Sequence, residues 1–223
     1  MKIEGKIIVP HVYLLKFETQ YELCMSFVRM QEFYESPKFR GKYFTLEKYI
    51  DYWSKEFGHG SFTYPSVWNG FNIPGKVLYD WINKFYFGHG NIRDREENIL
   101  HKICGLMGKE IGFTLMDSED MENIYVIGIH GKNNERTIQH ELAHAMYYLN
   151  EDYCKSCKTL LRKMDRKAYE TGKKWLLDKG YCNKMIDDEL QAYFSTGVSL
   201  SVADFQNNFS VFKKQIEKTE QEK

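Results

Sequence analysis

The stretch TIQHELAHAMYYLN, residues 137–150, carries two histidines and a glutamate at a spacing that suits a metal site. On an α-helix, His144 lies about 40° around the axis from His140, and Glu141 lies about 100° from it, so the three share one side. Imidazoles on successive turns can bind one Zn²⁺, whereas a carboxylate directly after the first histidine points beside the metal. We therefore predict that His140 and His144 are zinc ligands and that Glu141 is the general base for a zinc-activated water.

The rest of this segment predicts how the helix is held. It is expected to begin near Asn134, with Asn133 or Asn134 as its N-cap. The face opposite the histidines is apolar and consists of Ile138, Leu142, Ala145, Met146 and Leu149. Such a stripe predicts burial against a core, with the polar face turned into a site. The alternative, a helix with two ordinary surface histidines, does not explain this segregation.

A zinc site of this type needs a third side-chain ligand. The H-E-x-x-H-x-x-G-x-x-H pattern fails, because Tyr147 stands at the glycine position and Asn150 at the third histidine position. The later segment DDELQAYFSTG offers Glu189, which follows His144 by 45 residues. We predict Glu189 as the third ligand, with Asp188 as the alternative. A solvated carboxylate on a helix surface is the competing interpretation of Glu189.

Two histidines from H-E-x-x-H and a downstream glutamate resemble the gluzincin group of zinc metallopeptidases, the thermolysin-like class. The resemblance implies that the two histidines and Glu189 bind Zn²⁺, that Glu141 is the base, and that the substrate is a peptide or protein. It also implies that the strand IYVIGI, residues 124–129, is the edge strand along which an extended substrate adds. The likeness covers roughly residues 112–197. It departs from the best-known members in the long interval before Glu189 and in lacking their usual asparagine before that residue.

A second resemblance extends over most of the chain. The segments QEFYESPKFRGKYFTLEKY and WNGFNIPG, together with the pattern HExAH…DDExQAY, are similar to an uncharacterised family of predicted proteins from tailed-phage and algal-virus genomes. This likeness indicates that the two halves of the chain occur together. It implies no activity and no substrate.

Further candidates could assist hydrolysis of an acyl group. Tyr193 falls on the same helix face as Glu189, and His130 ends the predicted edge strand. We predict both as catalytic donors to a tetrahedral oxyanion, with Tyr181 as an alternative donor. For each, an ordinary role in a loop or in the core is the competing interpretation.

The five cysteines are odd in number and scattered, which does not indicate a disulfide framework. This usage favours a reducing, cytoplasmic compartment, and the viral likeness would place that compartment in an infected host. Cys154 and Cys157 form a lone C-x-x-C, which could bind a second metal with Cys182 or act in redox chemistry. Packing at the start of a helix is the simpler interpretation of an isolated pair.

Composition argues against two classes of partner. The 31 basic and 31 acidic side chains leave no net charge among 223 residues, so we expect no nucleic-acid partner. Pro10, His11 and Lys16 interrupt the apolar start of the chain, and no run approaches the 18 or so apolar residues of a membrane span. We therefore expect no secretory signal and no membrane association.

The periodicity predicts an α+β fold that is mostly helical. Short strands are expected within residues 5–17, an ordered loop at 58–76, and two β-runs forming a hairpin within 111–129, the second at 124–129. Helices are expected at about 19–35, 45–57, 77–86, 94–107, from 134 to about 150, 155–180, 185–196 and 202–217. The expected organisation is an N-terminal helical region with short strands, residues 1–110, packed on a zincin-like catalytic region with a small sheet or hairpin, residues 111–223, as one cooperative unit.

Three functions are compatible with these observations. The first is a zinc-dependent peptidase. The second is a binding or structural module that keeps the fold and the metal but has lost activity, and the third is a zinc hydrolase of non-peptide amides or esters. A retained Glu141 beside intact ligands argues against the second, because a purely structural site has no use for a base. The sequence does not separate the first from the third.

Overall fold

The computed structural model describes residues 1–108, 121–131, 134–197 and 202–221. The structure is α+β and mostly helical, as predicted. Its strands are β1 (Ile3–Val9), β2 (Val12–Phe17), β3 (Gly70–Pro74) and β4 (Tyr125–His130). Its α-helices are α1 (Gln20–Glu35), α2 (Leu46–Glu56), α3 (Gly75–Ile82), α4 (Asp94–Leu106), α6 (Glu135–Leu149), α7 (Glu151–Lys163), α8 (Arg166–Asp178), α9 (Ile186–Thr196) and α10 (Ala203–Gln221). Short turns of 3₁₀ or π helix lie at Tyr64–Ser66, Asn83–Phe87 and Asn183–Met185.

Four strands form one sheet in the order β1-β2-β4-β3. β1 and β2 are antiparallel, β2 and β4 are parallel, and β3 runs antiparallel to β4. Three of the strands come from the first 74 residues and the fourth from the second half of the chain. The sheet therefore joins segments that the sequence had suggested as separate regions.

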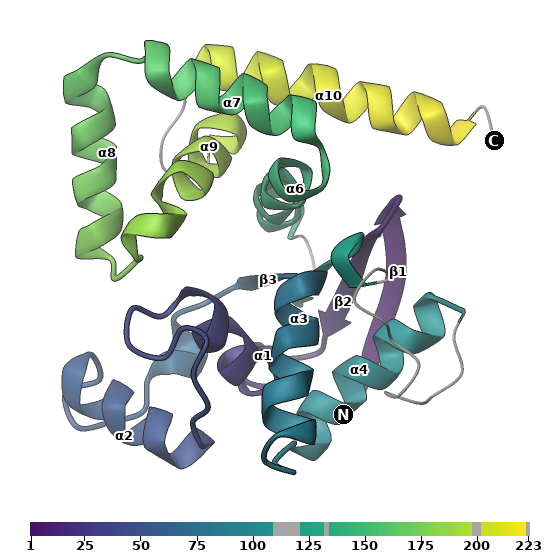
Figure 1. Cartoon of the computed structure of the whole chain (residues 1–223), viewed down its shortest axis with the longest axis vertical. Coiled ribbons are helices and arrows are strands. Elements are labelled where there is room, and N and C mark those ends of the chain that lie inside the picture. Colours follow the sequence, from purple (N-terminus) through teal and green to yellow (C-terminus); the bar gives the residue numbers. More distant parts are fainter. Residues whose placement is uncertain (109–120, 132–133, 198–201, 222–223) are drawn as a thin grey trace.

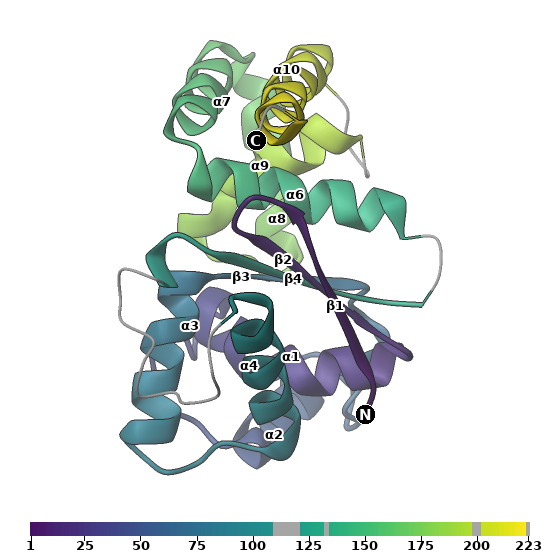
Figure 2. The ribbon, with the colours of Figure 1, turned by 90° about the vertical axis from the view of Figure 1, so that its right-hand side faces the viewer.

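The sheet is the middle of three layers (Figure 2). On one face lie α1, α2, α3 and α4, and on the other α6 with the C-terminal helices behind it. In Figure 1, α7 and α10 run side by side across the far end, with α6 and α9 beneath them. Because both faces are covered, the inner strands are apolar along their length: β2 has five buried residues of six.

Successive side chains of each strand point to opposite faces of the sheet, so the sheet separates two hydrophobic cores. Leu15 and Phe17 of β2 face α1, where Phe27 is fully buried. Leu14 of β2 and Ile127 of β4 face the opposite side and belong to a core with Leu142 of α6. The apolar stripe predicted for the metal helix is thus used to hold that helix on the sheet.

Local signals explain several helix starts. The side chain of Thr19 accepts a hydrogen bond from the amide of Glu22 at the start of α1, and that of Thr45 accepts one from Lys48 at the start of α2. Asn134 is the N-cap of α6, as predicted, but its side chain donates to the carbonyl of His130 instead of capping the helix. That bond fastens the end of β4 to the first turn of the metal helix.

The predicted edge strand is wrong. β4 pairs with β2 on one side and with β3 on the other, so it lies inside the sheet. The strand at the edge beside α6 is β3, which falls within the predicted loop at 58–76. The first run of the predicted hairpin lies in residues outside those described.

The single long helix predicted for residues 155–180 is also wrong. The chain turns at Met164, whose backbone is extended, and α8 begins after Asp165, whose carboxylate accepts from the amide of Ala168 at 2.9 Å. An N-cap of this kind stops one helix pattern from running into the next. α8 then packs against α9, where Gly172 faces Leu190.

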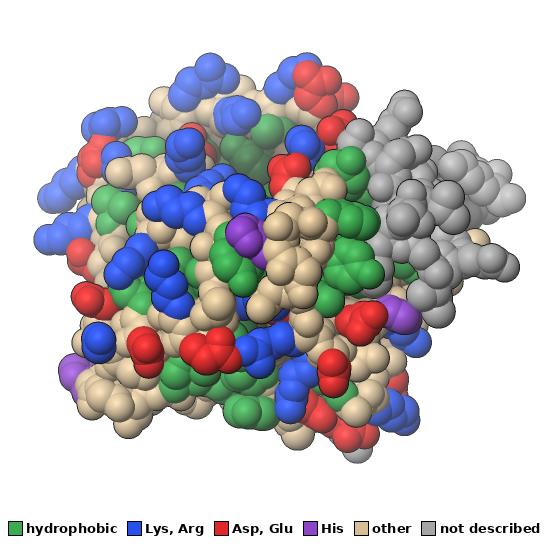
Figure 3. All heavy atoms as spheres, turned by 60° about the horizontal axis from the view of Figure 1, so that its bottom comes forward, with side chains coloured by type: hydrophobic (Ala, Val, Ile, Leu, Met, Phe, Trp, Pro, Cys, Tyr) green, Lys and Arg blue, Asp and Glu red, His purple; other side chains and the backbone are tan. Residues whose placement is uncertain are grey.

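The surface agrees with the balanced composition. On the face in Figure 3, Lys and Arg side chains are interspersed with Asp and Glu, with apolar atoms between them. Across the described ranges, no helix combines the length and apolar character that a bilayer span requires.

Candidate metal centre

Three side chains from two helices meet at one point on the side of the sheet that α6 covers. His140 and His144 come from α6 and Glu189 from α9, and one potential ligand atom of each lies within 4.8 Å of the others. The three are buried, with exposed fractions of 9%, 1% and 2%. α6 and α9 pack directly against one another, and the small, fully buried Ala192 of α9 shares a core with Ala143 of α6. The structure thus brings together the three ligands predicted from the sequence.

His144 is oriented by a carboxylate behind it. Its Nδ1 lies 2.8 Å from Oδ1 of Asp188, and the same oxygen accepts a hydrogen bond from Nε2 of Gln191 at 3.0 Å. Gln191 also donates to the carbonyl of Ala143 at 3.2 Å. A hydrogen bond at Nδ1 directs Nε2 of the imidazole toward the centre. Asp188, the alternative ligand, lies outside the group of His140, His144 and Glu189 and contacts the far nitrogen of His144.

His140 has a weaker anchor of the same kind. Its Nδ1 lies 3.5 Å from the hydroxyl of Thr196, which itself donates to the carbonyl of Ala192 at 2.7 Å. With its hydrogen committed to that carbonyl, the hydroxyl oxygen can accept from Nδ1. This arrangement again leaves Nε2 free for a metal.

The carboxylate of Glu189 indicates that a ligand belongs where the three side chains meet. Its Oε1 lies 3.7 Å from Nε2 of His144, which is longer than a hydrogen bond. Its Oε2 is buried and has no hydrogen-bond partner in the structure. An unpaired buried carboxylate oxygen is costly, and a metal ion bound between the two histidines and Glu189 would satisfy it. The donor set of two imidazoles and one carboxylate fits a divalent ion.

The protonation of the centre follows from burial and from charge. Burial lowers the pKa of His140 to about 3, and the charge of His144 adds to this effect. Burial also opposes the charged form of His144, but Asp188 and Glu189 outweigh it and raise the pKa of that imidazole. Burial raises the pKa of Glu189. Without a metal the cluster therefore holds protons that a divalent cation would replace.

Glu141 lies beside the ligands and is held from the sheet. Its Oε2 accepts from Nδ2 of Asn72 on β3 at 2.8 Å, and Oδ1 of Asn72 accepts from the hydroxyl of Tyr125 on β4 at 2.6 Å. These two hydrogen bonds fix the orientation of the Asn72 amide, because the hydroxyl of Tyr125 donates to the amide oxygen and leaves the nitrogen facing Glu141. A Cβ at Gly70 would come within 2.6 Å of Oε1 of Glu141, so only glycine lets β3 approach this closely.

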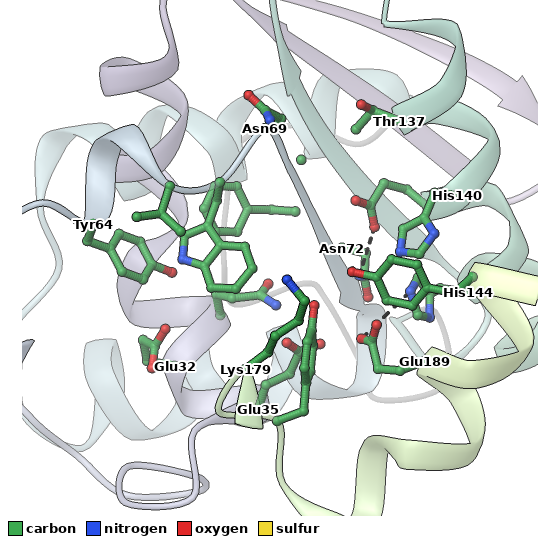
Figure 4. Close-up of a pocket in the computed structure, with 18 of the residues that line it drawn as sticks. Glu32, Glu35, Tyr64, Asn69, Asn72, Thr137, His140, His144, Lys179 and Glu189 are labelled. Atoms are coloured by element: carbon green, nitrogen blue, oxygen red, sulfur yellow. Dashed lines mark hydrogen bonds and ion pairs between the residues drawn. The ribbon is translucent and has the colours of Figure 1, made fainter. Parts of the chain in front are cut away.

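The centre opens into a cavity of about 460 Å³ between the two outer layers (Figure 4). One end holds His140, His144 and Glu189, and the other holds Glu32 and Tyr64. The cavity is lined by Gln31, Glu32, Glu35, Trp53, Tyr64, Val67, Trp68, Asn69, Gly70, Phe71, Asn72, Thr137, His140, Glu141, His144, Lys179, Tyr181, Glu189 and Tyr193. Residues from α1, β3, α6 and α9 thus share one space.

The structure places two of the predicted oxyanion donors at the cavity and one outside it. Tyr193 lines the cavity, with its ring 4.5 Å from that of His140, and Tyr181 lines it as well. Burial raises the pKa of Tyr193 to about 12, so its phenol keeps its proton at neutral pH. His130 is not among the lining residues; its Nε2 lies 3.2 Å from Oδ1 of Asn69 at the end of β4. The structure therefore brings Tyr193 to the centre but not His130.

The cysteines lie away from this chemistry. All five are free; Cys157 is buried in α7 beside Tyr153, and Cys154 is partly buried on the same helix. In the described part of the chain, the cluster of His140, His144 and Glu189 is the group of metal-ligating side chains found, and it includes no cysteine. Of the C-x-x-C pair, Cys157 is buried in the core, in line with the packing interpretation.

Several residues of the centre were missed in the sequence. Gln191 could have been inferred from helical spacing, since it lies three residues after Asp188 and so on the same face. Asn72 and Tyr125 gave no local signal, because they reach Glu141 through the pairing of β3 with β4. Glu35 belongs to a helix more than one hundred residues before the metal motif, and only the three-layer packing brings it to the cavity.

Comparison of the chain with protein-family models, with curated proteins and with solved structures found no significant match. The function is therefore argued from the site itself.

Proposed function

We propose that the protein is a zinc-dependent peptidase. The observation that carries the proposal is the division of labour on α6: His140 and His144 converge with Glu189, while Glu141 is held out of the ligand set by Asn72. A site that only bound a structural ion would need no ionisable group held beside it. A Zn²⁺ ion bound by the three ligands would supply Lewis acidity to a water molecule and to a substrate carbonyl.

The residues of the chain supply the remaining chemistry. Glu141 accepts a proton from the attacking water and passes it to the leaving amine. Its buried position favours this exchange, because burial raises the pKa of Glu141 from its ordinary value. Tyr193, whose phenol stays protonated, donates to the oxyanion that forms as the carbonyl is attacked.

The shape of the site supports a peptide as the substrate. β3 is an edge strand among the described strands, and its residues Gly70, Phe71 and Asn72 line the cavity. An extended peptide that pairs with β3 would run past the metal centre with its carbonyl groups presented in turn. We therefore assign β3 the role that sequence reasoning had given to residues 124–129.

Metal analysis and a peptide-library assay with a matched variant test this proposal. The purified protein should contain about one zinc ion per chain and cleave peptides. Glu141→Gln should keep the zinc, since Glu141 is not a ligand, and lose about two to four orders of magnitude in turnover. Loss of zinc in this variant would show that Glu141 is a ligand, and absence of cleavage by the zinc-loaded protein would reject the peptidase.

A further inference from the structure

The cavity continues beyond the metal centre into an acidic end formed by α1. Gln31, Glu32 and Glu35 line it there, and none of them takes part in metal binding or proton transfer as argued above. Figure 4 shows Glu35 between the end with Glu32 and Tyr64 and the end with Glu189. We refer to Gln31, Glu32 and Glu35 with the rings of Trp53, Tyr64 and Trp68 as the acidic chamber.

Two acceptors in the acidic chamber have no donor. Oε1 of Glu35 and Oε1 of Gln31 are both buried, and neither has a hydrogen-bond partner in the structure. Burial raises the pKa of Glu35 to about 8 and that of Glu32 to about 7, although hydroxyl groups beside Glu32 lower it in part. Buried acceptors without donors are costly, so a ligand that supplies donors is expected here.

Among the described residues, no Lys or Arg forms an ion pair with Glu32 or Glu35, although the charge of His144 lowers the pKa of Glu35 in part. Arg29, on the same helix, donates to both carboxylate oxygens of Glu96 and to Asn91, and its guanidinium lies over the rings of Trp81 and Phe85. Lys179 is the one Lys or Arg among the lining residues described. It is exposed, and its Nζ lies over the ring of Trp175, at 4.7 Å from the centroid.

Charge balance therefore favours a positive ligand. Four glutamates line the cavity: Glu32, Glu35, Glu141 and Glu189. If all four ionise, a divalent metal offsets the charge of two of them and Lys179 that of one more, which leaves one carboxylate without a counter-ion. With its pKa raised to about 8, Glu35 keeps its proton at neutral pH when no ligand is bound, and a bound cation would favour its ionised form. The aromatic rings of the acidic chamber suit a cation as well, because the faces of Trp and Tyr attract ammonium and guanidinium groups.

We propose that the acidic chamber binds an ammonium or guanidinium group of the substrate, with Glu35 as the principal determinant. This inference rests on the proposed peptidase function, since it names the peptides that the same site prefers. The cation comes either from a Lys or Arg side chain near the cleaved bond or from the α-amino group at the start of the peptide. Anionic side chains at the same place are disfavoured by the like charges of Glu32 and Glu35.

Three small probes separate these sources by calorimetry on zinc-loaded protein. Nα-acetyl-lysinamide carries only a side-chain ammonium, norleucinamide only an α-ammonium, and Nα-acetyl-norleucinamide neither. The measurement uses the Glu141→Gln background so that no probe is hydrolysed. One of the two cationic probes should bind about 10- to 100-fold more tightly than the neutral one, as a charge-assisted bond to a buried carboxylate provides.

Glu35→Gln is the decisive variant because it keeps the size of the side chain and removes its charge. It should reduce the preference for the cationic probe about tenfold or more, while Glu56→Gln, at an exposed position at the end of α2, should leave it unchanged. Zinc content and the thermal midpoint check that both variants fold. If Glu35→Gln does not fold, Gln31→Leu removes the second unpaired acceptor and should weaken the same preference.

The outcomes are distinct from those of the peptidase proposal. Tight binding of a cationic probe by a protein that cleaves no peptide would reject the peptidase and keep the acidic chamber as a cation site. Equal binding of the cationic and neutral probes, or a preference that survives Glu35→Gln intact, would overturn the assignment even if peptides are cleaved.

Discussion

Glu141 is the residue on which the proposed chemistry depends, and its neighbours set its proton affinity. Burial raises the pKa of its carboxyl, whereas the charge of His144 and the hydrogen bond from Asn72 lower it. Asn72 in turn is fixed by Tyr125. The pKa of the proposed general base therefore depends on residues of the sheet, and the proposed metal ligand His144 is oriented from α9. The residues that support Glu141 and those that support the metal ligands can therefore be substituted separately.

Asn72→Asp should move the acid limb of the pH profile to higher pH. A general base works when ionised, so activity is lost as the pH falls through the pKa of Glu141. The substitution removes a donor and adds a negative charge beside Glu141, and both changes raise that pKa further. The measurement is kcat/KM against pH for a peptide. Tyr125→Phe, which removes only the hydroxyl that orients Asn72, should move the limb less in the same direction. An unchanged limb in Asn72→Asp would contradict the role of Asn72.

Glu189→Ala and Asp188→Ala should separate a ligand from its support. Glu189→Ala should severely weaken zinc binding because it removes one of three ligands. Asp188→Ala should leave about one zinc bound and cost about 10- to 100-fold in affinity, as expected for the partner of a ligating imidazole. Zinc affinity is measured by competition with a chelator. Cys154→Ser with Cys157→Ser is the control and should not change it. Zinc retention in Glu189→Ala would remove the proposed ligand set.

At the scale of elements, the close approach of β3 to α6 positions Glu141, the proposed base, beside the candidate metal ligands. A Cβ at Gly70 would lie 2.6 Å from both Oε1 of Glu141 and Cγ2 of Thr137. Gly70 has no positive φ, so a larger residue is disfavoured here by the neighbouring helix and not by the backbone conformation of Gly70 itself. A glycine at this position therefore allows the short distance between β3 and α6.

Gly70→Ala should therefore lower turnover while the metal stays bound. The added methyl pushes Glu141 or β3 aside by a fraction of an ångström or more, which we expect to reduce kcat by about 10- to 100-fold. Gly105→Ala is the matched control: nothing lies within 4 Å of its added Cβ, and it lies on α4. That change should be neutral for activity and stabilise the helix by up to about 1 kcal/mol. Equal turnover in both variants would show that the contact at Gly70 does not matter.

Elements with local signals were predicted well, and those defined by distant partners were not. Helices were predicted from about residue 19 and at 45–57, and α1 and α2 begin there behind the N-caps Thr19 and Thr45; the periodicity around His140 predicted α6. β3 was missed because four of its five residues are buried without alternation and it ends at Pro74, and only pairing with β4 makes these residues a strand. The same limit applies to the site: the ligands followed from helical spacing, whereas Asn72 and Glu35 reach it through the sheet and the layers.

At the scale of the molecule, the sheet ties the metal centre to the N-terminal layer. β4, from the second half, lies between β2 and β3 from the first, and α1 supplies the acidic chamber from the far side of the sheet. Arg29 and Glu96 anchor that helix to α4 through a buried ion pair. Energy released by metal binding on α6 and α9 should therefore stabilise both layers together.

Zinc should raise the thermal midpoint of the whole chain in one transition. A ligand at 1,000 times its Kd stabilises the folded state by about 4 kcal/mol, and each kcal/mol shifts the midpoint of a domain this size by about 2 to 4 °C. Of the four tryptophans, Trp175 lies on α8, and the other three belong to the first 110 residues. In Trp175→Phe, fluorescence therefore reports on the N-terminal half alone. Its midpoint should rise with zinc by as much as the calorimetric midpoint does. Two calorimetric transitions, with zinc moving only one and the fluorescence midpoint unchanged, would show that the halves unfold independently despite the shared sheet.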